Sequence, residues 1–415
     1  MPDAAPPRHR LTAEETARRL GVKVETVYAY VSRGLLGSVR AADGRTSLFA
    51  PDDVDALARR AARGRRRDAS ARTFGDVATA LTLIDDDELY YRGLPVSRLI
   101  REHRFEAVAV FLWTESLDAD ARFETDPVAA AVARAAVSAL PARARVIDRL
   151  RVAVASAAAA DPLRYGTDLE AVTATGAGIL AVMVEALPAA DAPAAESAGE
   201  PPSLAARLWP RLTARPATAP ALAALDAALI LTADHGLAAS TTAARIAASV
   251  RADPYAVVQA GLGAVDGPHH GLASALAFRV LAEAHASGDP VAAVAERLRA
   301  RIPVPGFGHE AGVYPHGDVR ARELLLLLRE IPEARDVLDT VDGLTRAVSR
   351  RPALRPNVDL ALAALALSCG MPADAGEAVF AVGRTAGWIA HALEEYEAPP
   401  HRFRPRGTYV GRRPA

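Results

Sequence analysis

The sequence predicts an all-α body preceded by a small winged helix-turn-helix module. Apolar residues recur at helical spacing through residues 126–160 and, after an interruption, as far as Tyr396, whereas no alternating stretch of strand length follows residue 75. The alanine-rich segments indicate close-packed helices, because a small side chain lets two helix backbones approach each other. With 415 residues, 51% of them hydrophobic, the chain can bury a large core in two or three domains.

The first module opens with two helix signals. Thr12 is followed three residues later by Glu15, which fits a capping box, and the helix is expected to run through Leu20 and to stop at the glycine that follows. A second short helix is expected at residues 24–32. Two helices of this size, joined by a turn at glycine, are typical of a helix-turn-helix.

A small wing is expected after the two helices. Residues 40–49 contain an Asp-Gly pair, which is a tight-turn signal, and Pro51 is expected to open a third helix. Together, residues 10–67 resemble the winged helix-turn-helix of MerR-like proteins, and TVYAYVSRGLL is the most typical stretch.

The charge of this module suggests an anionic partner. Residues 1–67 hold 14 Lys or Arg against 8 Asp or Glu, while the whole chain has a formal charge of −1, so a basic arm precedes an acidic body. The module is predicted to bind DNA; the alternative is a small helical domain for protein contacts, with solvated arginines. The side chains expected to meet phosphates or base edges are Lys23, Thr26, Tyr28, Arg33, Arg40 and Arg45.

Composition argues against several classes of protein. Cys369 is the only cysteine, which rules out a disulfide framework and a cysteine-based zinc site; in an alanine- and leucine-rich helix it is expected to be buried. The sequence contains no apolar run of membrane-spanning length and no hydrophobic signal core. These features predict a cytoplasmic protein that does not bind membranes.

Two stretches are expected to lack regular structure. Residues 59–67 hold six arginines and are interpreted as a helix end that passes into a linker, with the next domain beginning near Thr73. Residues 187–203 are crowded with Pro, Ala, Asp, Glu, Ser and Gly and have no apolar period, which predicts a mobile surface insert.

Three histidines and one aspartate lie at the ends of predicted helices. His270 lies in a Gly-Pro-His-His-Gly break between two apolar helical runs, and His235 follows the apolar run 221–231. His309 ends a loop rich in proline and glycine, and Asp359 lies at the start of another apolar helix. A single histidine in a turn is more often structural than catalytic, but four such residues at helix junctions are interpreted as a candidate catalytic set.

Six motifs in this order resemble the citrate synthase family. They fall within residues 75–415 and read ADHGLAAST at 233–241, GPHHG at 267–271, PGFGH at 305–309, PNVDL at 356–360, GRTAGWIAH at 383–391 and RPRGTYVG at 404–411. The resemblance implies the two-domain helical fold of this family, which closes on its substrates and excludes water. It places the large domain at 68–273 and 379–415, the small domain on the acyl-CoA side at 274–378, and the winged module with its basic linker at 1–67.

The resemblance also implies a chemistry. An aldol-type condensation between an acyl thioester and a 2-oxo acid needs a base, a partner for the enolate oxygen and an acid for the alkoxide. By resemblance, Asp359 is the base and His270 holds the thioester oxygen. His309 would polarise and protonate the 2-oxo carbonyl, and His235 would bind the oxo acid as well.

Substrate contacts follow from the same resemblance. Guanidinium groups suit the two carboxylates of the oxo acid, and the resemblance assigns Arg320 and Arg384 of one subunit and Arg406 of the other to this task. The protein is therefore expected to be a homodimer. A coenzyme A thioester is expected as co-substrate, with no permanently bound cofactor and no metal ion. The loop expected to contact its adenine contains Val304, Gly306, Phe307 and Gly308.

Some positions differ from the family pattern. Thr232 stands where histidine is frequent, and Gly236 stands where glutamate is frequent, so binding of the oxo acid is expected to be altered. The segment after His309 is two residues longer than usual, which leaves Arg322 as an alternative to Arg320.

The expected activity is that of a transferase making citrate from oxaloacetate and acetyl-CoA. A 2-methylcitrate synthase that uses propionyl-CoA is the first alternative, because one methylene changes selectivity by only ~1–3 kcal/mol. A DNA-binding metabolite sensor with a synthase-like body is the second.

Overall fold

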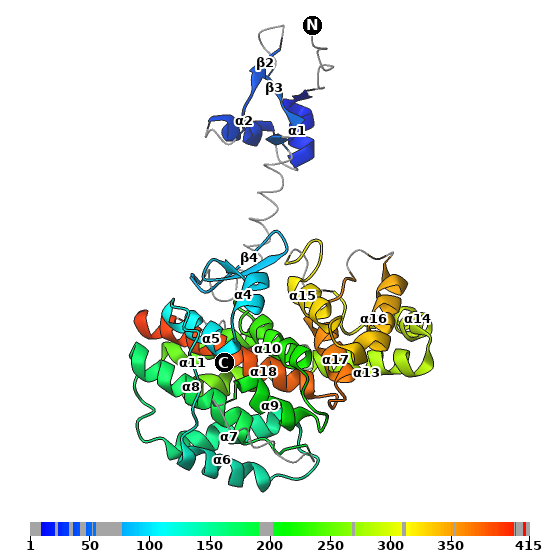
Figure 1. The fold of residues 1–415 in the computed structure, drawn as a ribbon. Coiled ribbons are helices and arrows are strands. Elements are labelled where there is room, and N and C mark those ends of the chain that lie inside the picture. Colours follow the sequence, from blue (N-terminus) through cyan, green and yellow to red (C-terminus); the bar gives the residue numbers. More distant parts are fainter. Residues whose placement is uncertain are drawn as a thin grey trace. The chain divides into compact units, whose positions relative to one another are not determined.

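The computed structural model describes residues 10–20, 24–32, 36–41, 47–51, 53–54, 77–190, 202–267, 270–308, 313–349, 351, 354–401, 403 and 410–411 (Figure 1). The chain divides into two compact units: the first comprises Met1–Ala78 and Pro405–Ala415, and the second comprises Thr79–Arg404. Each unit has its own hydrophobic core. The predicted arginine-rich linker and the middle of the predicted insert, residues 191–201, lie outside the described residues. The division of the body at residues 273 and 378 stays a prediction.

The first unit contains the predicted helices and wing strands. Its elements are β1 (Leu11–Thr12), α1 (Ala13–Leu20), α2 (Val24–Ser32), β2 (Val39–Arg40) and β3 (Ser47–Phe49), and the strands pair antiparallel in the order β1-β3-β2. The Glu15 amide donates to Thr12 Oγ1 at 3.3 Å, and the Thr12 amide donates to the Glu15 carboxylate at 2.8 Å. The predicted capping box and the first two predicted helices are therefore confirmed. Most of the predicted third helix after Pro51 lies outside the described residues.

The predicted nucleic-acid contacts in this unit fall largely outside the described part of the chain. Thr26 is half-buried on α2. Lys23, Arg33 and Arg45 lie outside the described residues, and the side chains of Tyr28 and Arg40 are not described. DNA binding by this unit therefore stays a prediction.

The second unit begins with a small sheet that the sequence analysis did not predict. Its strands β4 (Thr82–Asp85), β5 (Glu88–Tyr91) and β6 (Leu94–Pro95) pair antiparallel in that order. Asp86 and Asp87 turn the chain between β4 and β5 with φ of 48° and 62°, a left-handed conformation that aspartate tolerates better than most residues. Strands of two to four residues are too short to produce a clear alternating pattern.

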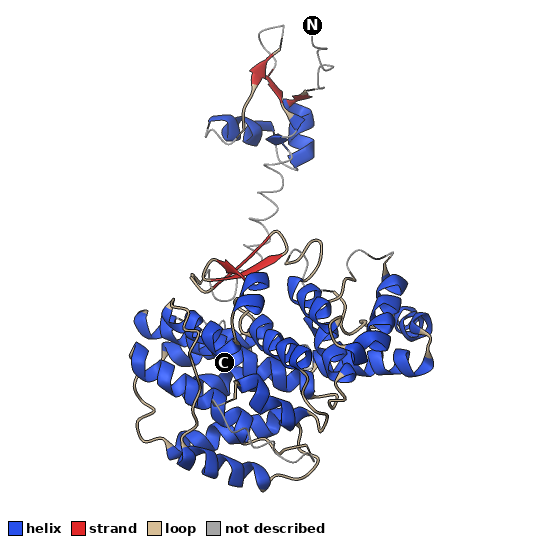
Figure 2. Ribbon diagram, viewed as in Figure 1, coloured by secondary structure: helices blue, strands red, loops and turns tan. Residues whose placement is uncertain are grey.

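The described elements after this sheet are all helical, which confirms the all-α prediction for the body (Figure 2). They are α4 (Val96–Glu102), α5 (Phe105–Thr114), α6 (Pro127–Ser138), α7 (Val146–Ala160), α8 (Leu169–Glu185), α9 (Leu204–Leu212), α10 (Ala219–Thr232), α11 (Ala239–Ser249), α12 (Pro254–Val265), α13 (Ala273–Ser287), α14 (Pro290–Ala300), α15 (Val319–Leu328), the 3-10 helix η1 (Pro332–Ala334), α16 (Arg335–Val348), α17 (Val358–Ser368) and α18 (Ala375–Glu397). Helices α13, α14, α16 and α17 pack together on one side of the unit (Figure 1).

Helix α18 is the central helix of the second unit. It has 23 residues, most of them buried, and it packs against α5, α7, α8, α10, α11, α12, α13 and α17. It carries charged side chains along its length, and no helix in the described part of the chain is long and apolar enough to cross a membrane. Cys369, just after α17, is buried as predicted.

Two carboxyl groups are close together between α5, α9 and α10. The Asp226 carboxylate accepts the Phe105 amide at 3.2 Å, and Glu106 Oε1 accepts the Leu204 amide at 2.6 Å. Burial, with a smaller contribution from the Glu106 charge, raises the pKa of Asp226 from 3.8 to about 7. The folded state thus binds this proton more tightly than the unfolded state.

Replacing Asp226 by asparagine should stabilise the protein at pH 8. A folded-state pKa that is raised contributes stability below the unfolded pKa, and this contribution is lost as the pH rises through the folded pKa. The asparagine side chain has no charge to bury, so we expect the free energy of unfolding to rise by up to about 4 kcal/mol at pH 8, from roughly three pKa units at about 1.4 kcal/mol each. Urea unfolding at pH 8 and near pH 4 measures the difference, which should shrink at the lower pH. A variant that is less stable at pH 8 would contradict this account.

Candidate functional site

Five of the predicted site residues line one cavity in the second unit. The cavity has a volume of about 480 Å³, and its polar lining is His235, His270, Arg320, Asp359 and Arg384. These residues come from separate segments between positions 235 and 384 of the chain, so the fold brings together what the motifs only suggested. Two further predicted residues, His309 and Arg406, lie outside the described residues.

His235 projects from the turn that follows α10. The preceding Asp234 closes this turn, because its Oδ2 accepts the Gly236 amide at 3.0 Å. Gly236 has a φ of +66°, which suits glycine better than the glutamate frequent in the family. His235 Nε2 lies 2.9 Å from the hydroxyl of Tyr314. Burial, together with the charges of two nearby arginines, lowers the pKa of His235 well below its usual range, so the imidazole is neutral.

His270 lies in the tight break between α12 and α13. The break needs glycine at position 271, because a Cβ there would lie 2.3 Å from Val265 Cγ1. His270 Nε2 lies 2.8 Å from Ser240 Oγ on α11, and its ring meets Phe380 edge to face at 5.3 Å. Burial and the Arg384 charge lower the pKa of His270 to about 4, so this imidazole is neutral as well.

The two arginines of the cavity are held in different ways. The buried Arg320 guanidinium forms a two-point ion pair with Asp318, with Nε to Oδ1 and Nη2 to Oδ2 both at 3.0 Å. Arg384 is also buried, and its Nε donates to the Thr232 carbonyl at 2.7 Å while its guanidinium lies 4.6 Å from the centre of the Phe380 ring. Arg384 forms no ion pair with a carboxylate of the described residues, so its charge can serve an anionic ligand.

Asp359 lies in the first turn of α17, where Asn357 caps the helix. Asn357 Oδ1 accepts the Asp359 amide at 3.1 Å. The same Asn357 donates its side-chain amide to the Gly308 carbonyl at 3.0 Å and its backbone amide to the Gly306 carbonyl at 3.0 Å. The loop 304–308 is therefore attached to the start of the helix that carries the carboxylate, and Asn357 joins the two.

Glycine is required at position 306 of this loop. Gly306 has a φ of +83°, and a Cβ there would lie 2.9 Å from the Cβ of Leu360. The loop therefore packs directly on α17 at this position. Its contact with coenzyme A stays a prediction.

The arrangement combines two cations, two neutral imidazoles and one carboxylate. Buried guanidinium groups bind carboxylates of a ligand strongly, and neutral imidazoles can donate a hydrogen bond to a carbonyl oxygen. A carboxylate beside them can accept a proton. These groups therefore support acid–base and electrostatic chemistry. Within the described residues, no group of three or more His, Cys, Asp or Glu side chains has the placement of a metal site.

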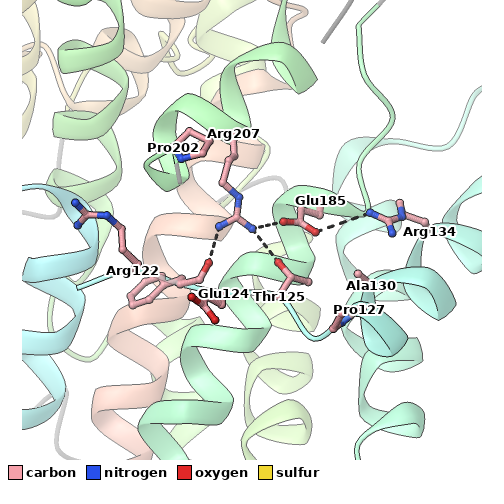
Figure 3. A pocket seen from close by; sticks show the side chains of 10 residues that line it. Arg122, Glu124, Thr125, Pro127, Ala130, Arg134, Glu185, Pro202 and Arg207 are labelled. Atoms are coloured by element: carbon pink, nitrogen blue, oxygen red, sulfur yellow. Dashed lines mark hydrogen bonds and ion pairs between the residues drawn. The ribbon is translucent and has the colours of Figure 1, made fainter. Parts of the chain in front are cut away.

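A second cavity, of about 560 Å³, lies elsewhere in the same unit (Figure 3). Arg207 donates to the Phe123 carbonyl and to Thr125 Oγ1, and it forms an ion pair with Glu185. Arg134 lies 3.8 Å from the same Glu185 (Figure 3). The Arg207 hydrogen bonds and ion pair join helices and the 122–127 segment, and none of the predicted site residues lines this cavity.

Sequence reasoning missed several residues that hold the site together. Ser240, Asp318 and Tyr314 each contact a predicted site residue. Ser240 lies 30 positions from its partner His270, and no spacing rule joins a serine on one helix to an imidazole in a distant break. Asp318 gives a local signal, because an aspartate just before an apolar helix is a typical N-cap.

Helix α18 approaches the His235 turn so closely that position 387 requires glycine. A Cβ at Gly387 would lie 2.3 Å from the Ala233 carbonyl and 2.8 Å from Asp234 Oδ1. We expect Gly387→Ala to push the turn away, to lower the free energy of unfolding by about 1–3 kcal/mol and to weaken binding of ligands to His235. Thermal unfolding and ligand titration measure both effects.

Gly178 provides the matched control for that substitution. It lies inside helix α8, and a Cβ there would meet nothing within 4 Å. Gly178→Ala should therefore stabilise the protein by roughly 0.5–1 kcal/mol, as alanine does in an unobstructed helix. If Gly387→Ala and Gly178→Ala changed the free energy of unfolding and ligand binding equally, the close approach of α18 would not be what fixes the His235 turn.

Comparison with known proteins identifies the family. A family model described as citrate synthase, C-terminal domain, matches residues 72–406, and one described as helix-turn-helix domain matches residues 10–62. Citrate synthase of Haloferax volcanii is 37% identical over 190 residues, which cover 45% of this chain and 49% of that protein. 2-Methylcitrate synthase 2 of Corynebacterium glutamicum is 28% identical over 356 residues, which cover 80% and 91%.

A solved structure supports the same assignment. It is the ternary complex of citrate synthase from Thermoplasma acidophilum with carboxymethyl coenzyme A and oxaloacetate, with a TM-score of 0.68, 25% identity, and coverage of 84% of this chain and 97% of that chain. The chain spans about half the length of relatives such as the Haloferax volcanii protein. Since the family model covers most of the chain, from residue 72 to residue 406, the chain belongs to the citrate synthase family, with a helix-turn-helix domain in front.

Proposed function

We propose that the protein is an acyltransferase that condenses acetyl-CoA with oxaloacetate to give citrate and free coenzyme A. The observation that carries this proposal is the single cavity that holds Asp359, two neutral imidazoles and two buried arginines. The family assignment adds support, and so does the Thermoplasma acidophilum enzyme, whose structure holds a coenzyme A derivative and oxaloacetate.

Proton removal from the acetyl group is assigned to Asp359. A thioester methyl group is a weak acid, so a carboxylate alone cannot remove its proton effectively; a hydrogen bond to the thioester oxygen must stabilise the enolate. His270 is suited to that task in the tautomer in which Nε2 accepts from the Ser240 hydroxyl, because the neutral ring then carries its proton at Nδ1. That N–H donates to the enol oxygen while Asp359 holds the proton.

Binding of the oxo acid is assigned to the two arginines and His235. Arg384 and Arg320 would each bind a carboxylate, and the neutral His235 would donate a hydrogen bond to the oxo acid. His309 would polarise the 2-oxo carbonyl and protonate the alkoxide that forms when the enol carbon attacks. Arg406 of a second copy of the chain would complete the site, which makes a homodimer the active form.

Binding of coenzyme A, the acyl carrier, is assigned to the loop that precedes His309. The main chain of residues 304–308 is attached to the start of α17 through Asn357 and Arg355. A coenzyme A adenine held by this loop would bring its thioester towards Asp359. Hydrolysis of the citryl thioester that results from condensation releases coenzyme A as the free thiol.

Propionyl-CoA is the alternative acyl donor. The 2-methylcitrate synthase of Corynebacterium glutamicum aligns over 91% of its length, whereas the match to the Haloferax volcanii citrate synthase covers about half of that protein. Thiol release with oxaloacetate and each thioester at matched concentrations separates the two. We expect acetyl-CoA to react faster, and a higher kcat/KM for propionyl-CoA would overturn this order.

A second candidate function belongs to the first unit. The helix-turn-helix match and the basic composition of residues 1–67 support DNA binding through residues 10–67. Titration of the full-length protein against duplex DNA at physiological salt tests it. Binding that weakens steeply with salt is expected, and DNA binding by a protein that releases no thiol would instead identify a DNA-binding sensor.

A further inference from the structure

A buried chain of polar contacts lies directly behind His235. One face of α18 makes these contacts, because Arg384, Gly387 and His391 are spaced by three and four residues and therefore lie in one row along the helix. Arg384 Nε donates to the Thr232 carbonyl at 2.7 Å, and the Gly387 amide donates to the Ala233 carbonyl at 3.1 Å. The third member, His391, faces Asp234, with its Nε2 3.3 Å from Asp234 Oδ1. These three α18 residues therefore contact three consecutive residues at and just after the end of α10, namely Thr232, Ala233 and Asp234.

Asp234 also forms hydrogen bonds that fix the turn carrying His235. Its Oδ2 accepts from the Gly236 amide at 3.0 Å and from Thr82 Oγ1 at 2.5 Å. Its backbone is held as well, because the Tyr91 hydroxyl donates to the Asp234 carbonyl at 2.9 Å. The carboxylate is fully buried, so a rotation of Asp234 would leave a desolvated charge without these donors.

The proton on His391 can be located from its second neighbour. Arg245 Nη1 lies 2.5 Å from His391 Nδ1. Glu394 Oε2 is farther from Nδ1, at 3.7 Å. A guanidinium has only donors, so the closer Arg245 contact assigns Nδ1 as the acceptor and places the proton of the neutral imidazole on Nε2, which faces Asp234. Arg245 is fixed in turn by Glu395, with Nε to Oε1 at 2.6 Å, and by Glu394, with Nη1 to Oε2 at 2.5 Å.

We propose that His391 is a positioning residue for oxo-acid binding: held as the Nε2–H tautomer by Arg245, it orients the Asp234 carboxylate, which fixes the turn that aims His235 into the cavity. The inference rests on the proposed function for the identity of the ligand, oxaloacetate. His391 itself does not line the cavity. Its loss should therefore weaken binding of the oxo acid and leave the acyl thioester and the proton-abstraction step largely unaffected.

Two substitutions at position 391 test the roles of the two ring nitrogens. A glutamine carboxamide can accept from Arg245 through its oxygen and donate to Asp234 through its nitrogen, whereas leucine can do neither. We expect His391→Leu to raise the KM and the Kd for oxaloacetate about ten- to a hundredfold, since small displacements of a binding group have effects of this size. His391→Gln should stay within about threefold of the wild type. The KM for acetyl-CoA should be unchanged in both.

A control and a second variant keep the test decisive. His285→Leu removes a histidine of α13 that contacts Thr340 Oγ1 at 3.0 Å outside the cavity, and it should leave both KM values unchanged. If His391→Leu does not fold, Thr82→Val tests the inference instead, because it removes the hydroxyl that donates to Asp234 Oδ2. This variant should raise the KM for oxaloacetate and leave the KM for acetyl-CoA unchanged.

The outcomes separate this inference from the proposed function. A wild-type protein that releases no thiol overturns the proposed function, and the Kd of oxaloacetate from isothermal titration calorimetry then still decides the inference. An unchanged Kd in His391→Leu, or equal losses in His391→Leu and His391→Gln, overturns it. A fall in kcat with no change in the KM or Kd for oxaloacetate would overturn it too.

Discussion

Replacing Asp359 by asparagine should lower the rate of thiol release by about 10²- to 10⁴-fold, the usual contribution of a general base. Asparagine has the same shape and cannot take up the methyl proton. The backbone around Asp359 is set by the Asn357 cap and by the first turn of α17, so the variant should keep its fold. The KM for oxaloacetate should change little, because the carboxylate contributes to the reaction step. Steady-state thiol release and thermal unfolding of the same preparation measure these expectations.

Asp339→Asn is the matched control for this prediction. Asp339 is an exposed aspartate on α16, and its replacement should leave kcat unchanged. An Asp359→Asn enzyme that retains the wild-type rate would remove the assignment of the base. If both variants lost activity equally, the loss would be unrelated to the cavity.

Replacing Arg384 by leucine should raise the KM for oxaloacetate about thirtyfold or more. Removing one partner of a buried charge pair costs at least roughly 2 kcal/mol, which corresponds to this factor. Arg384 is fully buried and has no ion-pair partner among the described carboxylates, so its charge should act mainly on the ligand. Arg384→Lys should recover only part of the affinity, because an ammonium group cannot form the planar two-point contact with a carboxylate. The KM for acetyl-CoA should stay within about twofold.

Arg207→Leu is the control for that experiment. Arg207 lines the other cavity, where it joins the Phe123 carbonyl, Thr125 and Glu185 (Figure 3). Its loss should lower stability without a change in either KM. If Arg207→Leu weakened oxaloacetate binding as much as Arg384→Leu, the effect would report general loosening of the helices, and the role assigned to Arg384 would be wrong.

Helices and their starts could be predicted from the sequence because the signals are local. The Thr12 and Glu15 capping box is confirmed, and so is the start of α12 at Asp253, whose side chain accepts the Ala256 amide at 3.0 Å. The β4–β6 sheet was not predicted, since its strands are short and apolar residues at exposed positions, such as Leu83, blur the alternation.

The site was predictable only as a set of residue types. The motifs supplied His235, His270 and Asp359, but their partners depend on how helices pack. Ser240 meets His270 because α11 packs against α12, the helix that ends at the break, and no local sequence pattern predicts that packing. The buried chain behind His235 has the same origin, because most of its contacts join residues more than 140 positions apart.

The most direct test of the account is the stoichiometry of products from oxaloacetate and acetyl-CoA. Free thiol and citrate are measured in the same reaction, with the full-length protein and each substrate omitted in turn. We predict one citrate for each thiol released, and neither product when oxaloacetate is absent. Thiol release without citrate, or oxaloacetate binding with no release from either acetyl- or propionyl-CoA, would contradict the claim that this cavity catalyses the condensation.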